Sequence, residues 1–277
     1  TPRQGRRQRQ MCIRDRLMPL HRWLPAAMVA PTPVSALLHA VAVVKAGVFS
    51  VLKVTIYIFG PSVVSSLNEW IVWLPALTIL LASLMAMTRD NLKERLAYST
   101  VSQLSYIVMG AVLANQMGLL GGSMHIAMHA FAKITLFFAA GAILVATHKT
   151  EVSQLGGLGQ KMPFTFIFFA IGAASIVGLP PFGGMWSKWY LALGTVETGQ
   201  WALLGVLMLS SLLNIVYLLV IPVRAFMGNA EQPNSGEIKE APVTCLIGMS
   251  IPALMCVYLF FNPDPFYSLA QTLANQG

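Results

Sequence analysis

Long apolar segments alternate along the chain with short stretches rich in glycine, proline, asparagine and charged residues. A helix that crosses a bilayer needs about 20 predominantly apolar residues, and turn residues mark its ends. This pattern predicts seven membrane-spanning helices after a partial apolar element at residues 17–28; they lie at residues 34–59, 70–88, 96–114, 119–147, 164–194, 201–226 and 242–261. The predicted fold class is therefore all-α, a polytopic membrane protein.

The composition agrees with this fold class. Hydrophobic residues make up 56% of the chain and charged residues 10%, whereas a soluble domain carries about 25% charged residues. The formal net charge is +8, but six of the 18 Lys and Arg residues lie within residues 1–16. The rest of the chain has no basic patch that could follow a phosphate backbone, so nucleic acid is not an expected partner.

Residues 1–16 differ from everything that follows. They contain no apolar core and no run of small residues, so they are neither a signal peptide nor a membrane span. We expect a non-native or disordered arm; the alternative is a genuine basic arm beside the membrane. The apolar pattern begins abruptly at Leu17, which predicts a chain shortened on its N-terminal side. Cys12, Cys245 and Cys256 lack the spacing of a disulfide or metal site.

Lys and Arg are distributed unequally between the predicted loops, and short loops retained in the cytoplasm collect these residues. Alternate loops hold all of them, and the loops between, like the tail after Phe261, hold none. The basic loop residues are Arg89, Lys93 and Arg95, then Lys149 and Lys161, then Arg224 and Lys239. This asymmetry predicts cytoplasmic basic loops and a C-terminus on the outer side.

The predicted span 164–194 is interrupted by the sequence GLPPFGG, residues 178–184. Prolines and glycines at this density do not continue an α-helix, and free backbone groups at membrane depth occur where protein or water covers them. We therefore expect a broken helix beside an internal cavity; its breaking residues are Gly178, Pro180, Pro181, Gly183 and Gly184. The alternative is an ordinary loop between two short helices.

The predicted spans contain basic residues but no Asp or Glu. These residues are His39, Lys45, Lys53, His125, His129, Lys133 and Lys188. A lysine at the centre of a membrane helix costs about 2.5–3.5 kcal/mol, so such residues usually face the interior and mark an ion pathway. His125, His129 and Lys133 follow at intervals of four residues and project from one side of a helix.

Other roles remain open for some of these side chains. Lys53 lies near the end of its span, where its amino group can reach the membrane surface. His39 can be a neutral packing residue. His125 and His129 have the spacing of metal ligands, but no third ligand of the zinc type follows, and a haem would need histidines on two facing helices.

A proton pathway explains the pattern best. A neutral histidine can accept a proton at one ring nitrogen and release one from the other. The reference pKa of histidine is about 6.5. Removal of a lysine from water favours its neutral form and so helps it to release a proton. A helix face with two histidines and a lysine therefore indicates proton movement rather than substrate binding.

Five segments together resemble a known family of membrane proteins. They are LHRWLPAAMVAPTPVSALLHAVAVVKAG (20–47), LKERLAYSTVSQLSY (92–106), HIAMHAFAKITLFFAAG (125–141), GGLGQKMP (156–163) and GLPPFGGMWSKW (178–189). They resemble the antiporter-like subunits shared by Mrp-type monovalent cation/proton antiporters, respiratory complex I and membrane-bound hydrogenases. Within this family the chain is most similar to the D-type subunit of the Mrp antiporters.

The resemblance implies a fourteen-helix fold with two inverted five-helix repeats. Residues 17–60 would end the first repeat, residues 70–226 would form the second, and residues 242–277 would be a final membrane helix with an outer tail. The resemblance also implies roles along a midplane proton pathway. Lys45 and His39 would belong to the helix that ends the first repeat, Lys133 with His125 and His129 would be the central connection, and Lys188 would face an outer half-channel.

The sequence departs from the family pattern in two places. The family's first repeat would supply a buried glutamate and a lysine upstream of residue 17, where this chain has its basic arm. The usual aspartate of the loop before Lys93 is replaced by Asn91, with Asp90 beside it.

These observations lead to a main hypothesis, a proton-translocating subunit of a cation/proton antiporter and thus an ion transporter subunit rather than an enzyme. Its expected partners are other membrane subunits, protons and Na⁺ or another monovalent cation, in a bacterial inner membrane. Alternatives are the pumping subunit of a redox complex and a structural subunit with an unused pathway. The chain contains no cofactor motif, so we expect no bound cofactor.

Overall fold

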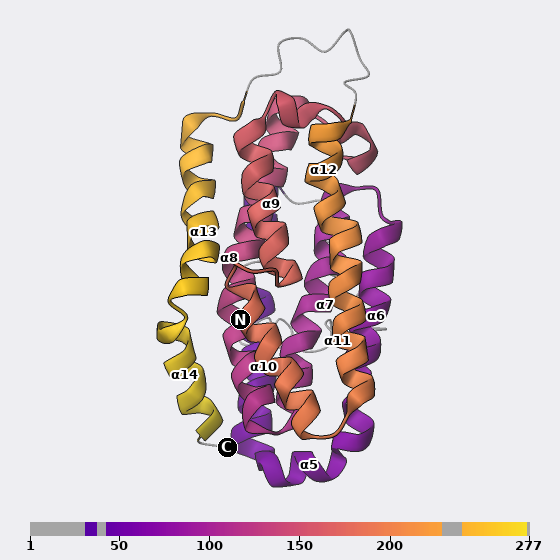
Figure 1. Ribbon diagram of the computed structural model, residues 1–277, viewed down its shortest axis with the longest axis vertical. Coiled ribbons are helices and arrows are strands. Elements are labelled where there is room, and N and C mark those ends of the chain that lie inside the picture. Colours follow the sequence, from indigo (N-terminus) through magenta and orange to yellow (C-terminus); the bar gives the residue numbers. More distant parts are fainter. Residues whose placement is uncertain (1–30, 38–42, 229–239, 276–277) are drawn as a thin grey trace, which may run out of the picture.

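The computed structural model describes residues 31–37, 43–228 and 240–275. These residues form a bundle of helices that is longest along the helix axes (Figure 1). Residues 1–30 and His39 lie outside this described part, and so does Lys239 of the predicted basic loops. The structure confirms the all-α fold class: in the described part, β-type pairing is limited to one isolated bridge between Asn91 and Glu151.

The first described helices are α3 (Thr32–Ala36) and α4 (Val43–Lys53), which continues into the π-helical segment η4 (Val54–Phe59). These elements occupy the predicted span 34–59. The chain then turns at Gly60, whose φ of 73° is in the left-handed region. Helix α5 (Gly60–Ile71) follows and lies across one end of the bundle (Figure 1). The sequence analysis did not predict this helix.

The next three helices are α6 (Trp73–Thr88), α7 (Leu92–Leu113) and α8 (Gln116–Thr147), and each packs against the next. Two asparagines start α7 and α8. The side chain of Asn91 accepts hydrogen bonds from the backbone N–H groups of Lys93 and Glu94, and Asn115 accepts one from Gly118. These caps satisfy N–H groups that have no partner within a helix. They allow tight turns between long antiparallel helices.

The structure confirms the predicted break. Helix α9 (Pro163–Val177) ends at Gly178, which has a φ of 88°, and α10 begins at Gly184 and runs to Glu197. Both helices pack along α8. A Cβ added at Gly172 of α9 would lie 3.0 Å from the Ala132 oxygen, and one at Gly121 of α8 would lie 2.6 Å from the Leu191 nitrogen. The two short helices therefore cover successive parts of one long helix, as a single interrupted span does.

The remaining helices complete the bundle. Helix α11 (Trp201–Asn214) continues through the π-helical segment η7 (Ile215–Leu219) into α12 (Val220–Met227). Helix α13 (Val243–Phe261) is followed by α14 (Asp264–Asn275), and both contact α8. The prediction of an outer tail after residue 261 missed the helical character of α14. Two short 3₁₀ helices, η5 (Val152–Leu155) and η6 (Leu158–Gln160), lie in the connection before α9.

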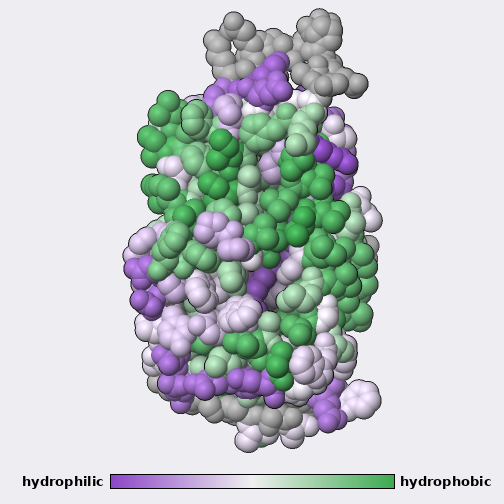
Figure 2. All heavy atoms as spheres, viewed as in Figure 1, coloured by the Kyte–Doolittle hydropathy of each residue, from purple (hydrophilic) through white to green (hydrophobic). Residues whose placement is uncertain are grey.

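Five helical stretches of the described part are long and apolar enough to cross a membrane. They are Glu69–Thr88, Leu92–Leu113, Gln116–Thr147, Trp201–Met227 and Val243–Phe261. Hydrophobic side chains cover most of the side surface in Figure 2, and hydrophilic ones gather mainly toward the two ends. The predicted spans 34–59 and 164–194 are not among the five, because residues 38–42 fall outside the described part and the second span is broken.

The first two predicted basic loops meet α12 at one end of the bundle. Asn91 pairs with Glu151, and Asp90 accepts hydrogen bonds from the backbone N–H of Ser153 at 3.1 Å and from its hydroxyl at 2.5 Å. The η5 and η6 turns contact α12 at this end (Figure 1). Asp90 thus fastens the loop before α7 to the loop before α9, while Asn91 caps α7.

Candidate functional site

Helix α8 carries three of the predicted site residues through the middle of the bundle. His125, His129 and Lys133 are 2%, 1% and 0% exposed, so none of them faces lipid. The imidazole centroids of His125 and His129 lie 5.8 Å apart. The four-residue spacing therefore produces a buried basic stripe, as the sequence predicted.

Lys45 of α4 contacts this stripe. Its Nζ lies 2.6 Å from Nδ1 of His129, and both side chains are buried. An ammonium group can only donate, so Nδ1 accepts this hydrogen bond and a neutral His129 carries its proton on Nε2. Two positive charges at this separation would repel strongly away from water. The contact is therefore less costly with one positive charge on the two side chains than with two.

His125 has partners at both ring nitrogens. Nδ1 lies 2.9 Å from the hydroxyl of Ser187 on α10, and Nε2 lies 3.1 Å from the side-chain oxygen of Gln103 on α7. The Tyr106 ring stacks on the imidazole at a centroid distance of 5.7 Å. The ring thus connects α7 with α10, and it can take up a proton on one side and release one on the other.

Lys188 lies one turn into α10, just after the break. Its Nζ donates to the carbonyl oxygen of Val177 and to the hydroxyl of Ser211, both at 3.0 Å, and it lies 5.0 Å from the centre of the Tyr106 ring. The last carbonyls of a helix have no partner within that helix. The break therefore supplies the acceptor that holds the Lys188 amino group inside the bundle.

A groove of about 600 Å³ lies beside Lys188, between the broken helix and α11. Its lining is mainly apolar and includes Leu179, Trp189, Met208 and Leu212. In Figure 2 a small hydrophilic patch lies in a hollow at mid-height, bordered by weakly polar and apolar surface. The groove thus gives the Lys188 side chain a lateral opening with apolar walls.

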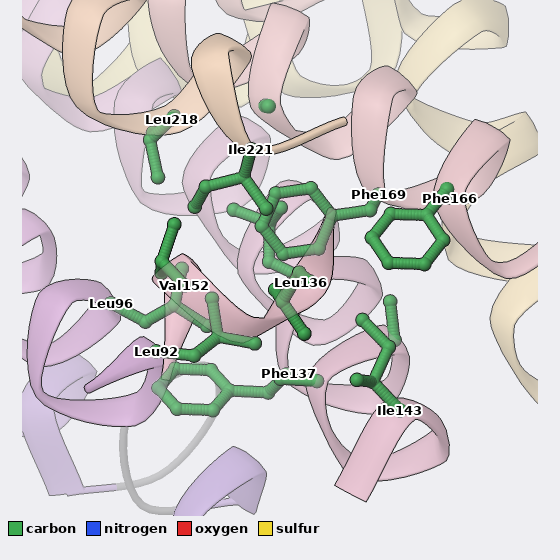
Figure 3. Packing of buried hydrophobic residues seen from close by; sticks show 14 of the residues in the cluster. Leu92, Leu96, Leu136, Phe137, Ile143, Val152, Phe166, Phe169, Leu218 and Ile221 are labelled. Atoms are coloured by element: carbon green, nitrogen blue, oxygen red, sulfur yellow. The ribbon is translucent and has the colours of Figure 1, made fainter. Parts of the chain in front are cut away.

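Lys133 points to α7. Its Nζ donates to the Ser99 hydroxyl at 2.8 Å and to the Leu96 carbonyl oxygen at 3.0 Å. The resemblance implied that Lys133 forms a central connection with His125 and His129; the structure brings Lys45 to His129 and Lys133 to Ser99. Beyond Lys133, toward the basic loops, the core is apolar and contains Leu96, Leu136, Phe137, Phe166 and Phe169 (Figure 3).

The other predicted residues have different positions. Lys53 is exposed at the end of α4, with Nζ 5.7 Å from the centre of the Phe49 ring, which fits the surface role left open for it. His39 lies outside the described residues. The breaking residues from Gly178 to Gly184 form the turn between α9 and α10.

Sequence reasoning missed a group of buried polar side chains on α6, α7 and the α11–η7 helix. They are Ser83, Ser99, Ser102, Gln103, Tyr106, Ser210, Asn214 and Tyr217, and each is at most 1% exposed. Their helical spacing was a usable signal, since Ser99, Ser102, Gln103 and Tyr106 share one face of α7, as Ser210, Asn214 and Tyr217 share one face of the next helix.

Buried basic side chains beside a broken membrane helix are the arrangement found in membrane transport proteins. The chain belongs to the family described as NADH:quinone oxidoreductase/Mrp antiporter, transmembrane, whose model matches residues 11–214. It is an antiporter-like, multi-pass membrane subunit. The family predicted from the motifs is thereby confirmed.

Similar proteins include subunits of quinone oxidoreductases. NADH-quinone oxidoreductase subunit N of Desulforudis audaxviator is 37% identical over 250 residues, which cover 88% of this chain and 49% of that protein. NAD(P)H-quinone oxidoreductase chain 5 of Picosynechococcus is 41% identical over 179 residues, 61% of this chain and 26% of that protein. The chain thus spans half or less of the length of these two relatives.

Solved structures have the same fold. A chain of the Mrp complex from Dietzia superposes with a TM-score of 0.88 at 22% identity, over 95% of this chain and 57% of that chain. A chain of the membrane-bound sulfane sulfur reductase, an archaeal respiratory membrane complex, has a TM-score of 0.83 at 26% identity, over 96% of this chain and 54% of that chain. The described helices therefore have the arrangement of an antiporter-like subunit.

Proposed function

We propose that this chain conducts protons through the membrane interior along its buried lysines and histidines, as a D-type subunit of an Mrp-type cation/proton antiporter. The contact between Lys45 Nζ and His129 Nδ1 at 2.6 Å carries the proposal. A buried pair of bases is costly unless one proton is shared, and a shared proton is one that can move.

The pathway would run from Lys45 to His129, then to His125, and on through Ser187 toward Lys188. The two imidazole rings are 5.8 Å apart, a separation that one bridging water can span. Lys133 lies one turn beyond His129 on the same side of α8 and would join the pathway there. His39 is a further candidate near Lys45 in the sequence.

A second candidate function is the proton-pumping subunit of a complex I-type or hydrogenase redox complex. The relatives that are quinone oxidoreductase subunits favour it. The same side chains would then move protons, and redox centres in other subunits would drive them. Genes beside this one would separate the two functions, since small Mrp subunits indicate an antiporter and iron–sulfur subunits indicate a redox complex.

We further propose that the chain lies in a bacterial inner membrane with other membrane subunits as partners. The basic loops would face the cytoplasm, because Lys and Arg concentrate in cytoplasmic loops, and α14 would lie on the outer side. In the antiporter, Na⁺ or another monovalent cation would be exchanged for protons. The chain itself would be a transporter subunit without a redox centre of its own.

Proton flux in proteoliposomes that contain the complete parent complex tests the proposed function. Lys133→Ala and Lys133→Arg should both abolish flux while the complex still assembles, because arginine keeps its proton at all relevant pH values. Lys53→Ala is the matched control on an exposed lysine and should retain flux. Near wild-type flux with Lys133→Arg would show that fixed positive charge, not proton exchange, is the role of this position.

A further inference from the structure

A second groove, apart from the one at the broken helix, runs between α4, α8 and α14. Helix α14 packs on α8 and α4 packs on α7, and a space of about 230 Å³ opens between them. The small side chains of Ala127 on α8 and Ala270 on α14 leave room for it. Its walls are mainly apolar and include Phe49, Leu52, Ile126 and Leu273. We call this space the α14 groove, and it contains none of the buried histidines.

The α14 groove has a single charged side chain among its described lining residues, that of Lys53 on α4. This side chain is exposed, and its amino group lies 5.7 Å from the centre of the Phe49 ring. No other described residue holds the amino group by a hydrogen bond or an ion pair. An ammonium group has three N–H donors, so Lys53 can bind an anion without losing an internal hydrogen bond. The groove therefore favours an occupant with a negative charge at one end.

The α14 groove also has a hydroxyl group without a partner. Ser123 of α8 lines the groove, and its Oγ is buried with no hydrogen-bond partner among the described residues. Serines in helices often donate to the carbonyl one turn back, as Ser50 does to Ala46. Because a serine side chain moves between staggered rotamers, the Ser123 hydroxyl can turn into the groove. Buried water needs two to four polar partners, which these apolar walls do not supply. A single acceptor on a largely apolar molecule suits this hydroxyl better.

The α14 groove lies near one end of the bundle, where the membrane surface is expected. Trp70, Trp73 and Trp201 are exposed at this end, which α5 crosses (Figure 1). Tryptophan side chains collect at the level of the lipid headgroups. Lys53 precedes the turn at Gly60 by seven residues, a rise of at most about 10 Å. From this depth a long lysine side chain can reach the headgroups. The amino group can therefore meet a lipid phosphate while the groove lies among acyl chains.

We propose that the α14 groove is a binding site for an anionic phospholipid. The phosphate binds Lys53, an ester carbonyl oxygen accepts a hydrogen bond from Ser123, and the upper part of one acyl chain fills the groove. A methylene group is about as large as a water molecule, about 30 Å³, so a space of about 230 Å³ holds about seven or eight of them. One turn of an α-helix, about 10 Å wide and about 5.4 Å long, takes up about 400 Å³. The groove therefore fits an acyl chain and not a helix of another subunit.

Photolabelling of the complete parent complex in phosphatidylcholine vesicles tests the site. The probe is phosphatidylglycerol with a diazirine within the first eight carbons of one acyl chain, and mass spectrometry maps the label. The same diazirine on phosphatidylcholine is the comparison, because its headgroup has no net charge. Label from phosphatidylglycerol should appear at Ile126 of α8 and Leu269 of α14, about fivefold above that from phosphatidylcholine. Fivefold corresponds to about 1 kcal/mol, the contribution of one lysine beside anionic lipid.

Two variants change the two parts of the site separately. Lys53→Ala should remove the preference for phosphatidylglycerol, so that both probes label the groove equally. Ala127→Leu fills the groove and should lower labelling by both probes about tenfold. The matched controls are Lys161→Ala, an exposed lysine in the loop before α9, and Ala202→Leu, an exposed alanine on α11. Both controls should label as the wild type does.

Three results would overturn the site. Equal labelling of the wild type by the two probes would mean that bulk lipid alone touches the groove. Absence of label at Ile126 and Leu269 with either probe would mean that another part of the complex covers it. A preference for phosphatidylglycerol that persists in Lys53→Ala would mean that Lys53 does not bind the phosphate. The readout is lipid binding rather than proton flux, so each result is independent of the proposed function.

Discussion

Substitution of Gly184 by alanine should push α10 away from α9, the other half of the broken helix. Gly184 is the first residue of α10, and a Cβ added there would lie 1.9 Å from the carbonyl oxygen of Ser175 on α9, whereas ordinary contact begins at 3.4 Å. The obstacle is backbone, which cannot rotate away as a side chain can. The first turn of α10 would have to withdraw by about 1.5 Å, a large shift for a close-packed interior.

The size of the effect follows from this geometry. Overpacking a well-packed site costs about 1–3 kcal/mol and occasionally more, and we expect the upper part of this range. For a chain of this size, about 3 kcal/mol lowers Tm by roughly 6–12 °C. The shift also carries Lys188, one turn further along α10, away from Val177 and Ser211. Loss of proton flux should therefore accompany the loss of stability.

Thermal unfolding of the purified complex in detergent, followed by flux in proteoliposomes, measures both effects. Gly205→Ala on α11 is the matched control, because nothing lies within 4 Å of its added Cβ. Alanine there should stabilise α11 by up to about 1 kcal/mol through helix propensity. A wild-type Tm and wild-type flux in Gly184→Ala would refute the reasoning that close backbone contact holds the break together.

Three further predictions test other parts of the structure. Lys133→Met should leave Tm unchanged or raise it, while proton flux is lost. Replacing a fully buried charge by an apolar side chain of similar volume is often neutral or stabilising by about 1–4 kcal/mol. A large fall in Tm would mean that Lys133 is needed for folding. Asn91→Ala should lower the free energy of unfolding by about 1 kcal/mol through loss of the α7 cap, without changing proton flux. Urea unfolding measures this free energy, and an unchanged midpoint would contradict a stabilising cap at Asn91. With the native cysteines replaced, a membrane-impermeant thiol reagent should label Thr272→Cys but not Glu151→Cys in intact cells, and the reverse pattern would invert the proposed orientation.

The helices and the break could be predicted from local sequence. Apolar length placed α6 to α13 with small errors at their ends, and the prolines and glycines of residues 178–184 located the break, because these residues act on the backbone wherever they occur. Helices α5 and α14 were missed, since both are short, carry polar residues and lie beside the spans. Their position depends on contacts with the bundle rather than on membrane length.

Contacts between site residues were harder to predict. The spacing of His125, His129 and Lys133 fixed their common side of α8, but not which neighbour each would meet. Lys45 lies on α4, which packs against α7, and its side chain reaches His129 on α8. Lys133 turns to α7. Neither choice of partner is encoded in the local sequence. The buried polar side chains of α6, α7 and the α11–η7 helix were overlooked because serines and threonines in a helix often bond to their own backbone, as Thr100 and Ser105 do.

The complete enclosure of α7 has a consequence for the assembly of this protein in the membrane. Other parts of the structure cover this helix along its whole apolar length. If α7 met acyl chains alone, Ser99, Ser102 and Gln103 would face hydrocarbon without partners. Helix α7 therefore depends on α6 and α8 during insertion, and these three helices are expected to leave the translocation machinery as one hairpin-linked unit.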